Sequence, residues 1–270
     1  MHRGAQVAEG FGERLKGWRR RRGFSQLALA TEVGVSARHL CFVETGRSKP
    51  SVEMIERLAD GLEIPLREQN DLLLLAGYAP QYQQHSLDAP ELKAVNSVVG
   101  MMLEQHEPYP ALVLDRYWDL VRMNQAARRL FEPVAAGIAG TLNSIDIFLG
   151  HPAVRQMVQN WTELAFHTRE RLRAQVRHLG RNDPRLNALL ERTEGYLDGE
   201  EAPRGRFEGP TLTTQLLING EQINTISTIT AFSGAADVLV DDLRIELVFP
   251  ADDAAARWFR AAVPPLVPES

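Results

Sequence analysis

Basic and aromatic side chains share one face of a short helical pattern that runs from Ala37 to Thr45. Leu40 and Val43, three residues apart, form its apolar face, whereas Arg38 and Phe42, four residues apart, lie on the opposite side. A guanidinium can donate to O6 and N7 of one guanine, which is worth about 1–3 kcal/mol of discrimination, and apolar groups can contact the thymine methyl. The alternative is an ordinary exposed arginine on a surface helix. The pattern predicts contacts with DNA bases from Ala37, Arg38, His39 and Phe42.

Two capped helical patterns would place this face on the protein surface. Ser25 is placed to cap the first helix, which ends at Gly34 because glycine adopts the left-handed backbone conformation at low cost. Ser36 is placed to cap the second helix, which ends at Gly46. Two helices joined by such a turn are typical of the helix-turn-helix, whose second helix contacts base edges through its N-terminal residues.

Further helical patterns complete an all-α domain. Phe11 to Arg22 predicts the first helix, Ser51 caps a fourth, and a fifth runs from Pro65 to Gly77. The stretch that follows is polar, contains two prolines and has no clear period. We therefore predict a five-helix DNA-binding domain over residues 1–80 and a linker over residues 81–90.

Positive charge is concentrated in the same region. Residues 11–49 hold nine Lys or Arg against three Asp or Glu, although the whole chain of 270 residues has a net charge of −5. A basic segment on an acidic chain predicts one focused DNA-contacting surface rather than indiscriminate nucleic-acid binding. Arg47 and Lys49 lie in the loop after the second helix of the pair, where they suit contacts with phosphate.

The segment resembles the XRE group of lambda-repressor-like domains. The resemblance rests on Ser25-Gln26, Leu29-Ala30, Val33-Gly34-Val35-Ser36 and Glu44-Thr45-Gly46-Arg47. It implies that Gln26 contacts a phosphate or base, that Arg47 contacts the DNA backbone, and that Arg19 pairs with Glu44 to join the first helix to the recognition helix. The predicted DNA-binding residues are Gln26, Ser36, Ala37, Arg38, His39, Phe42, Arg47 and Lys49.

Residues 91–270 predict a second domain of the α+β class. Asn219-Gly220 between two β-branched runs is the strongest short signal of a β-hairpin, and residues 198–209 predict a mobile loop. The predicted helices cover residues 91–107, 124–131, 153–179, 184–197 and 252–261. The predicted strands cover residues 111–115, 118–122, 211–218, 223–232 and 243–249.

This second domain resembles the MmyB-like domains that follow an XRE domain in some regulators. Within the first domain, SARHLCFVETGRSKPS is similar to XRE regulators that carry such a second domain. Within the second domain the resemblance rests on PYPALVLDRYWDLVRMNQAARRLF and DDLRIELVFPADD. It implies a PAS-like fold, in which an antiparallel sheet flanked by helices encloses a pocket. The family's Asn-to-Leu-His-Pro stretch corresponds to residues 143–152, although Gly150 separates Leu149 from His151 and the usual arginine is missing.

A PAS-like pocket would be lined mainly by apolar and aromatic groups. The resemblance implies an apolar small molecule such as a fatty acid as the ligand. Asn124 is the candidate polar anchor, and each candidate has the alternative of being an ordinary core residue. The candidate aromatic lining residues are Trp118, Phe131, Phe148, Trp161, Phe166 and Phe232.

Signals of catalysis, metal binding and membrane insertion are missing from the sequence. It has no HExxH, GxSxG, GxxxxGK[ST] or GxGxxG motif, and its histidines are too scattered for a ligand set. The single cysteine, Cys41, cannot form an internal disulfide, and no apolar run approaches 18 residues. We predict a cytoplasmic protein that is not an enzyme, with no catalytic residue, no metal, no cofactor and no membrane partner.

One helix-turn-helix covers only a few base pairs, so useful specificity needs two copies on half-sites about one helical turn apart. We therefore predict a homodimer that regulates transcription from a near-palindromic double-stranded DNA operator. The apolar ligand would shift the population between dimer geometries. Two alternatives stay open: the second domain binds a partner protein and no small molecule, or the chain is an enzyme with a DNA-targeting domain.

Overall fold

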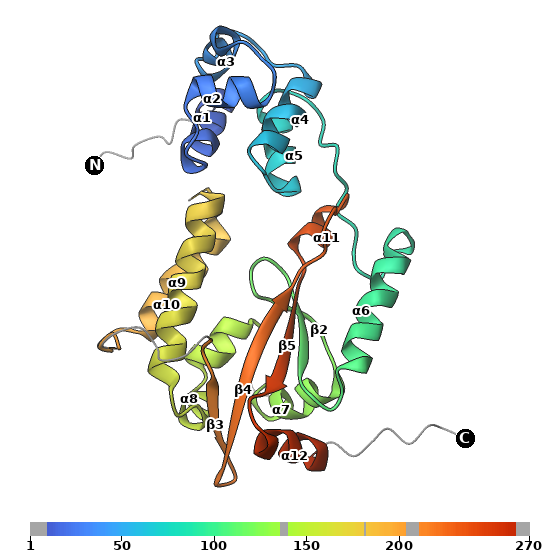
Figure 1. Cartoon of the computed structure of the whole chain (residues 1–270), viewed down its shortest axis with the longest axis vertical. Coiled ribbons are helices and arrows are strands. Elements are labelled where there is room, and N and C mark those ends of the chain that lie inside the picture. The colour runs from blue at the N-terminus through green and yellow to red at the C-terminus, as the bar shows by residue number, and fades with distance from the viewer. Residues whose placement is uncertain (1–9, 136–139, 181, 204–210, 263–270) are drawn as a thin grey trace. The chain divides into compact units, whose positions relative to one another are not determined.

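The computed structural model describes residues 10–135, 140–180, 182–203 and 211–262. The chain divides into two compact units (Figure 1). The first unit comprises the residues up to His85 together with residues 177–180 and 234–241, and the second comprises the remainder. Each unit has its own core and is described by itself.

Residues 11–75 of the first unit form five short helices. Serine hydroxyls cap three of them: Ser25 accepts from the Ala28 amide at 3.0 Å, Ser36 from His39 at 3.1 Å and Ser51 from Met54 at 3.3 Å. The predicted all-α domain is confirmed. The helices are α1 (Phe11–Arg21), α2 (Gln26–Glu32), α3 (Ala37–Glu44), α4 (Val52–Gly61) and α5 (Leu66–Leu75).

The core of this unit brings α1 against the C-terminal end of α3. Leu15 and Trp18 of α1 are buried together with Leu40 of α3. A Cβ atom added at Gly12 would lie 2.2 Å from the carbonyl oxygen of Glu44, which is far inside van der Waals contact. Glycine at this position therefore lets the two helix backbones approach closely.

The second unit contains a five-stranded antiparallel sheet in the order β2-β1-β5-β4-β3. Asn219 and Gly220, with φ of 52° and 83°, form the turn between β3 and β4 that the Asn-Gly signal predicted. The predicted α+β class is confirmed. The strands are β1 (Ala111–Leu114), β2 (Leu120–Met123), β3 (Thr214–Ile218), β4 (Glu221–Thr230) and β5 (Arg244–Pro250).

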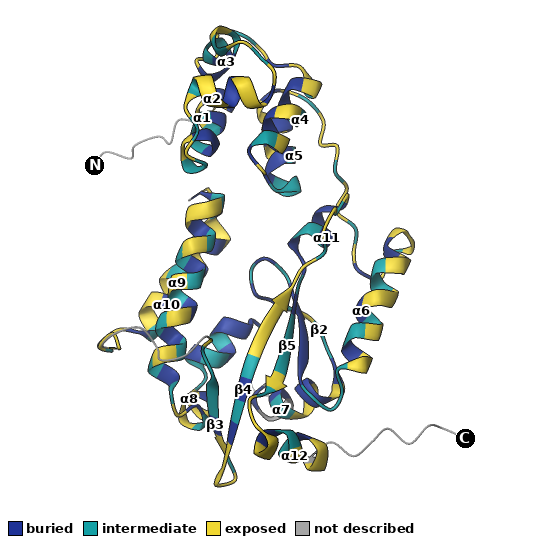
Figure 2. Cartoon of the chain, in the orientation of Figure 1, coloured by how far each residue is buried: buried dark blue, intermediate teal, exposed yellow. Residues whose placement is uncertain are grey.

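Helices surround this sheet. In Figure 1, the paired helices α9 and α10 lie on the β3 side and α6 lies on the β2 side. β1 is buried along its whole length, whereas β4 is exposed over its C-terminal part (Figure 2). The main helices are α6 (Lys93–Gln105), α7 (Gln125–Ala135), α9 (Trp161–Leu179), α10 (Pro184–Tyr196) and α12 (Asp253–Ala262). Shorter segments are η1 (Pro90–Leu92), the π-helix η2 (Asp146–Gly150) and α8 (Pro152–Met157). The short helix α11 (Val238–Asp242) lies almost entirely within the residues of the first unit.

The predicted continuous helix over residues 153–179 is wrong, because the chain leaves the helical conformation between α8 and α9. Val158 forms an isolated β-bridge with Leu216, and the Gln159 amide donates to the Gln215 carbonyl at 2.8 Å. The Asn160 carboxamide donates to Thr213 at 2.8 Å and accepts from Gln215 at 3.0 Å. Pairing with β3 thus replaces the helical hydrogen bonds at this point. The predicted loop over 198–209 lies partly outside the described residues.

Replacement of Gly12 by alanine should lower the free energy of unfolding of the first unit by about 1–3 kcal/mol, because the added methyl has no room against the α3 backbone. Gly100, inside α6, is the matched control, since a Cβ there meets nothing within 4 Å. Gly100→Ala should instead stabilise the protein by about 0.5–1 kcal/mol. Urea unfolding of the full chain, followed by circular dichroism, measures both. Equal stability of Gly12→Ala and wild type would refute the close approach.

Candidate functional site

The N-terminal end of α3 presents the residues that the sequence predicted to contact bases. The Arg38 side chain is exposed, and its guanidinium carbon lies 5.4 Å from the centre of the Phe42 ring, one turn along the helix. His39 and Phe42 are half-buried, and Ala37 packs against the core. Ser36 uses its hydroxyl to cap the helix. The structure thus brings Arg38, His39 and Phe42 together on one side of α3, with Arg38 the most accessible donor.

A buried ionic cluster holds the other end of α3. Glu44 accepts from Arg19 Nε at 2.6 Å and Nη2 at 2.9 Å, and from the Gln26 carboxamide at 2.7 Å. The side chain of Glu44 is only 2% exposed. Burial opposes its ionisation, but the hydrogen bonds from Arg19 and Gln26 outweigh this and lower the pKa of Glu44 below its ordinary value. The Arg19–Glu44 pair that the XRE resemblance implied is therefore present. Gln26, which the same resemblance implied as a DNA contact, donates to Glu44 in this structure.

The basic loop after α3 is exposed. The Arg47 amide donates to the Phe42 carbonyl at 2.8 Å, which fixes the loop against the helix and leaves the guanidinium in solvent. Lys49 Nζ lies 4.2 Å from the centre of the Tyr78 ring, and the Tyr78 hydroxyl donates to the Pro50 carbonyl at 3.0 Å. Lys49 is therefore held over an aromatic ring but stays solvent-accessible.

The second unit has a cavity of about 270 Å³ between α9, η2 and the sheet, and this cavity is partly open to solvent. Its lining is mostly polar. The polar lining residues are Ser144, His167, Thr168, Arg171, Thr211, Thr214, Ser227 and Glu246. The apolar lining residues are Ile145, Phe148, Leu164 and Leu212.

A smaller cavity of about 60 Å³ adjoins it and is mainly apolar. Phe148, Thr214, Ser227 and Glu246 line both cavities, so the two share a wall. The other side chains of the smaller cavity come from α7, α8, α12 and the sheet, and include Leu112, Phe131, Val154, Met157, Leu216 and Phe259. The second unit thus offers a polar chamber beside an apolar one.

Two of the predicted ligand-lining residues meet at this shared wall. The rings of Phe131 and Phe148 pack edge to face, with centroids 5.5 Å apart. Trp118 does not line either cavity but contacts a residue that does: its ring lies 4.1 Å from the guanidinium carbon of Arg171. Its indole donates to Gln175 at 3.0 Å. Trp118 has a φ of 67°, an unusual value for a bulky residue.

The other predicted ligand residues do not line either cavity. Asn124 accepts from the Ala111 and Ala127 amides at 3.0 Å and donates to the Tyr109 carbonyl at 2.8 Å, so its carboxamide is engaged in joining β1 to α7. Trp161 is buried beneath Arg155, and half-buried Phe166 lies under Arg169. Phe232, which follows β4, is half-buried.

Arg171, His167 and Glu246 line the larger cavity and were missed by the sequence analysis. Burial lowers the pKa of His167, and the charge of Arg171 adds to this effect. The spacing of His167 and Arg171, one helical turn apart, could have drawn attention to this face. Nothing local distinguishes Arg171 from the other arginines of α9, because its position depends on strands that come later in the chain.

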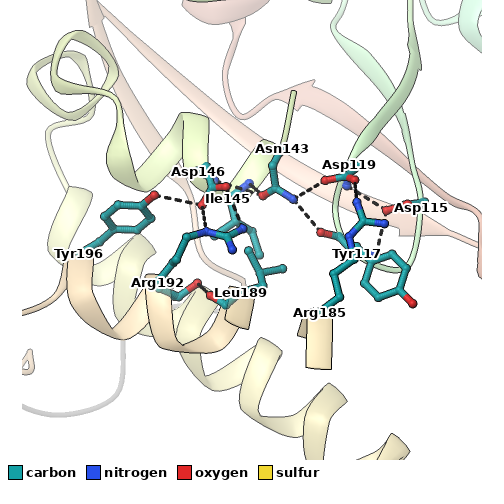
Figure 3. Close-up of polar contacts among 11 residues, drawn as sticks. Asp115, Tyr117, Asp119, Asn143, Ile145, Asp146, Arg185, Leu189, Arg192 and Tyr196 are labelled. Carbon is teal, nitrogen blue, oxygen red and sulfur yellow. Dashed lines mark hydrogen bonds and ion pairs between the residues drawn. The ribbon is translucent and has the colours of Figure 1, made fainter. Parts of the chain in front are cut away.

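A polar network ties the segment over residues 141–146 to the β1–β2 hairpin and α10 (Figure 3). Asn143 donates to the Tyr117 carbonyl and to Asp119, both at 2.7 Å, and accepts from the Ile145 amide at 3.1 Å. Arg185 pairs with Asp119 at one end of the network. At the other end, Asp146 accepts from Arg192 at 3.0 Å and from the Tyr196 hydroxyl at 3.0 Å. These contacts make the Asn143 segment a structural brace.

Two negative findings apply to the described ranges only. No helix there is long and apolar enough to cross a membrane. No group of three or more His, Cys, Asp or Glu side chains is arranged to hold a metal ion within those ranges.

Comparison with known protein families assigns both halves of the chain. Residues 11–72 match a helix-turn-helix domain, and residues 95–262 match the MmyB-like transcription regulator ligand binding domain. The second match covers more than half of the 270 residues. No curated protein matches the chain. The predicted combination of a helix-turn-helix with an MmyB-like domain is confirmed, while assignment to the XRE group stays a prediction.

Replacement of Glu44 by glutamine should lower the free energy of unfolding of the first unit by about 3–5 kcal/mol, since it leaves the buried Arg19 without a counter-charge. Because the pKa of Glu44 is lower in the folded protein than in the unfolded chain, the stability difference between wild type and Glu44→Gln should depend on pH. Stabilisation by ionised Glu44 is complete above the ordinary pKa of 4.5 and is lost as pH falls through the lower pKa of the folded state. Melting curves between pH 7 and pH 2 should therefore show the gap between wild type and Glu44→Gln closing in acid.

Glu13→Gln serves as the control for this measurement, because Glu13 is 65% exposed and pairs with Lys16 at 3.2 Å on the surface. It should change stability by less than about 1 kcal/mol. A gap between wild type and Glu44→Gln that stays constant down to pH 2 would contradict the assigned role.

Proposed function

The chain belongs to the MmyB-like transcription regulator ligand binding domain family, and we propose that it acts as a homodimer whose operator binding responds to an amphipathic or apolar small molecule. Its helix-turn-helix domain and its ligand-binding domain make it a DNA-binding transcriptional regulator. The proposal concerns the finer points: which residues contact DNA, how many copies bind, and what the second domain holds.

One observation carries the DNA-binding part of the proposal. The N-terminal end of α3 is exposed and carries Arg38, while its C-terminal end is held by the buried Glu44 cluster. The planar fork of a guanidinium is pre-organised, so less side-chain entropy is lost per hydrogen bond formed, which favours a bidentate contact with guanine. Arg47 and Lys49 lie in the loop that follows, where exposed cations support contacts with phosphate.

The homodimer follows from the size of this surface. A single recognition helix contacts a few base pairs, so two copies related by a twofold axis would be needed for a specific operator. Such an operator is near-palindromic, with half-sites about one helical turn apart.

The paired cavities of the second unit support a small-molecule ligand. Phe131 and Phe148 give the ligand an apolar wall, and the adjoining chamber of about 270 Å³ gives it room for a polar end. A fatty acid satisfies both requirements. The ligand would act by binding more tightly to one dimer geometry than to another, since only differential affinity shifts such an equilibrium.

Replacement of Arg38 by alanine should weaken binding to the preferred operator by about 1–3 kcal/mol and should relax base preference at one position per half-site. Selection of binding sites from a random DNA pool, followed by fluorescence anisotropy on the selected operator, measures both effects. Unchanged operator affinity in the variant would defeat the assignment of Arg38.

Lys49→Ala is the matched comparison for this prediction, because it removes a cation that faces phosphate rather than bases. It should weaken binding to all sequences alike and reduce the salt dependence of the association constant by about one unit of slope. A base-selective effect of Lys49→Ala would contradict its role in phosphate contact.

Native mass spectrometry of freshly purified protein tests the assembly and the ligand together. The expected result is a dimer with additional mass that is released on denaturation and extracts as an organic acid or lipid. A monomer at micromolar concentration would contradict the dimer. A dimer without additional mass would favour the alternative in which the second domain binds a partner protein.

A further inference from the structure

We infer that the larger cavity of the second unit selects an amphipathic organic carboxylate that also carries a hydrogen-bond donor near its carboxylate. Arg171 would bind the carboxylate, Glu246 would accept from the donor, and the apolar chain would extend past Phe148 into the smaller cavity. The inference rests on the proposed function, because it assumes that this domain binds a small molecule, and it specifies which chemical class.

Arg171 is the group that points to an anion. It lines the larger cavity from α9, and its Nε is buried without a hydrogen-bond acceptor among the described residues. A buried donor left unpaired costs about 1–3 kcal/mol, and more when the group is charged. An arginine fork matches the two oxygens of a carboxylate, so a bound carboxylate would remove this cost.

The surroundings of Arg171 hold its guanidinium in place. Its guanidinium carbon lies 4.1 Å from the centre of the Trp118 ring, and the Trp118 indole donates to Gln175, one turn further along α9. Gln175 in turn donates to the Arg116 carbonyl at 2.7 Å. The backbone of Trp118 has a φ of 67°, and such unfavourable conformations persist where the surrounding structure imposes them, often at binding sites. The Trp118 ring is therefore held in place, and its face provides a fixed stacking partner for the guanidinium of Arg171.

Glu246 is the group that points to a hydrogen-bond donor on the ligand. It lines both cavities from β5. Burial lowers the pKa of Arg171, and the negative charge of Glu246 acts in the opposite direction. Within the described residues no hydrogen bond or ion pair joins the two side chains. A ligand that brought only a carboxylate would place that charge in the chamber that also holds Glu246. A donor on the ligand would pair with Glu246 and offset this repulsion.

The lining agrees with a polar head and a short apolar chain. Eight of the twelve residues around the larger cavity are polar, so a ligand that is apolar throughout would leave hydroxyl and charged groups unpaired. Phe148 stands where the two cavities meet, and the smaller one provides about 60 Å³ beyond it. This polarity favours a hydroxylated acid of modest length over a long plain fatty acid.

Titration calorimetry of the full chain with octanoate, 1-octanol and 3-hydroxyoctanoate tests the inference. Octanoate should bind at least about tenfold more tightly than 1-octanol, and 3-hydroxyoctanoate should bind more tightly still. Arg171→Gln should weaken octanoate binding by about ten- to a hundredfold and leave 1-octanol unchanged. Glu246→Met, which removes the acceptor at similar size, should abolish the advantage of 3-hydroxyoctanoate over octanoate.

Arg173→Gln is the matched control, since Arg173 lies two residues along α9 but pairs with Glu170 and Glu194 on the surface. It should bind all three probes as the wild type does. 1-Octanol has no carboxylate, so its binding should not depend on Arg171. Binding of 1-octanol to Arg171→Gln therefore shows that the variant is folded. Retained octanoate affinity in Arg171→Gln would overturn the inference.

The outcomes separate this inference from the proposed function. If 1-octanol binds but octanoate binds no more tightly, the cavity accepts apolar ligands and only the carboxylate assignment fails. If octanoate and 3-hydroxyoctanoate bind equally to the wild type, the role given to Glu246 fails. If none of the three probes binds, both the inference and the small-molecule part of the proposed function fail.

Discussion

The buried carboxylate of Glu44 is the constraint on which the recognition surface depends. A charge that is 2% exposed must be matched by partners at hydrogen-bond distance, and here Arg19 of α1 and Gln26 of α2 provide them. Three helices are therefore joined at one point near the end of α3. Gly12 allows the same approach from the backbone side, because α1 can lie directly against the carbonyl of Glu44. The exposed face of α3 that carries Arg38 is therefore oriented by contacts made at the opposite end of the helix.

Carboxamide side chains perform the corresponding task in the second unit. Asn124 joins β1 to α7, Asn143 joins the loop before η2 to the β1–β2 hairpin, and Asn160 joins α9 to β3. Each side chain both donates and accepts, so it satisfies backbone groups at places where regular hydrogen bonding ends. Asn124 was predicted from the sequence to anchor a ligand, but its carboxamide atoms are engaged in hydrogen bonds within the fold.

The cavity shows why residue type alone is a weak guide to a binding site. Aromatic residues were chosen because pockets are commonly apolar, and Phe131 and Phe148 do line the smaller cavity. Trp161 instead packs beneath Arg155, and Phe166 packs beneath Arg169. The charged groups that give the larger cavity its character, Arg171 and Glu246, come from a helix and a strand about 75 residues apart in the sequence. No local pattern can place them together, because only the pairing of β5 with β1 and β4 does so.

Local signals by themselves determined the five helices of the first unit, the helix-turn-helix and the turn at Asn219-Gly220, because capping serines, left-handed glycines and apolar periods act within a few residues. They also indicated an α+β second unit. The tertiary structure alone decided the break between α8 and α9, where β3 competes for the backbone of Val158 and Gln159. It also decided the strand order and the cavity around Arg171. Those features arise from contacts between distant segments, whose energies are absent from any short stretch of sequence.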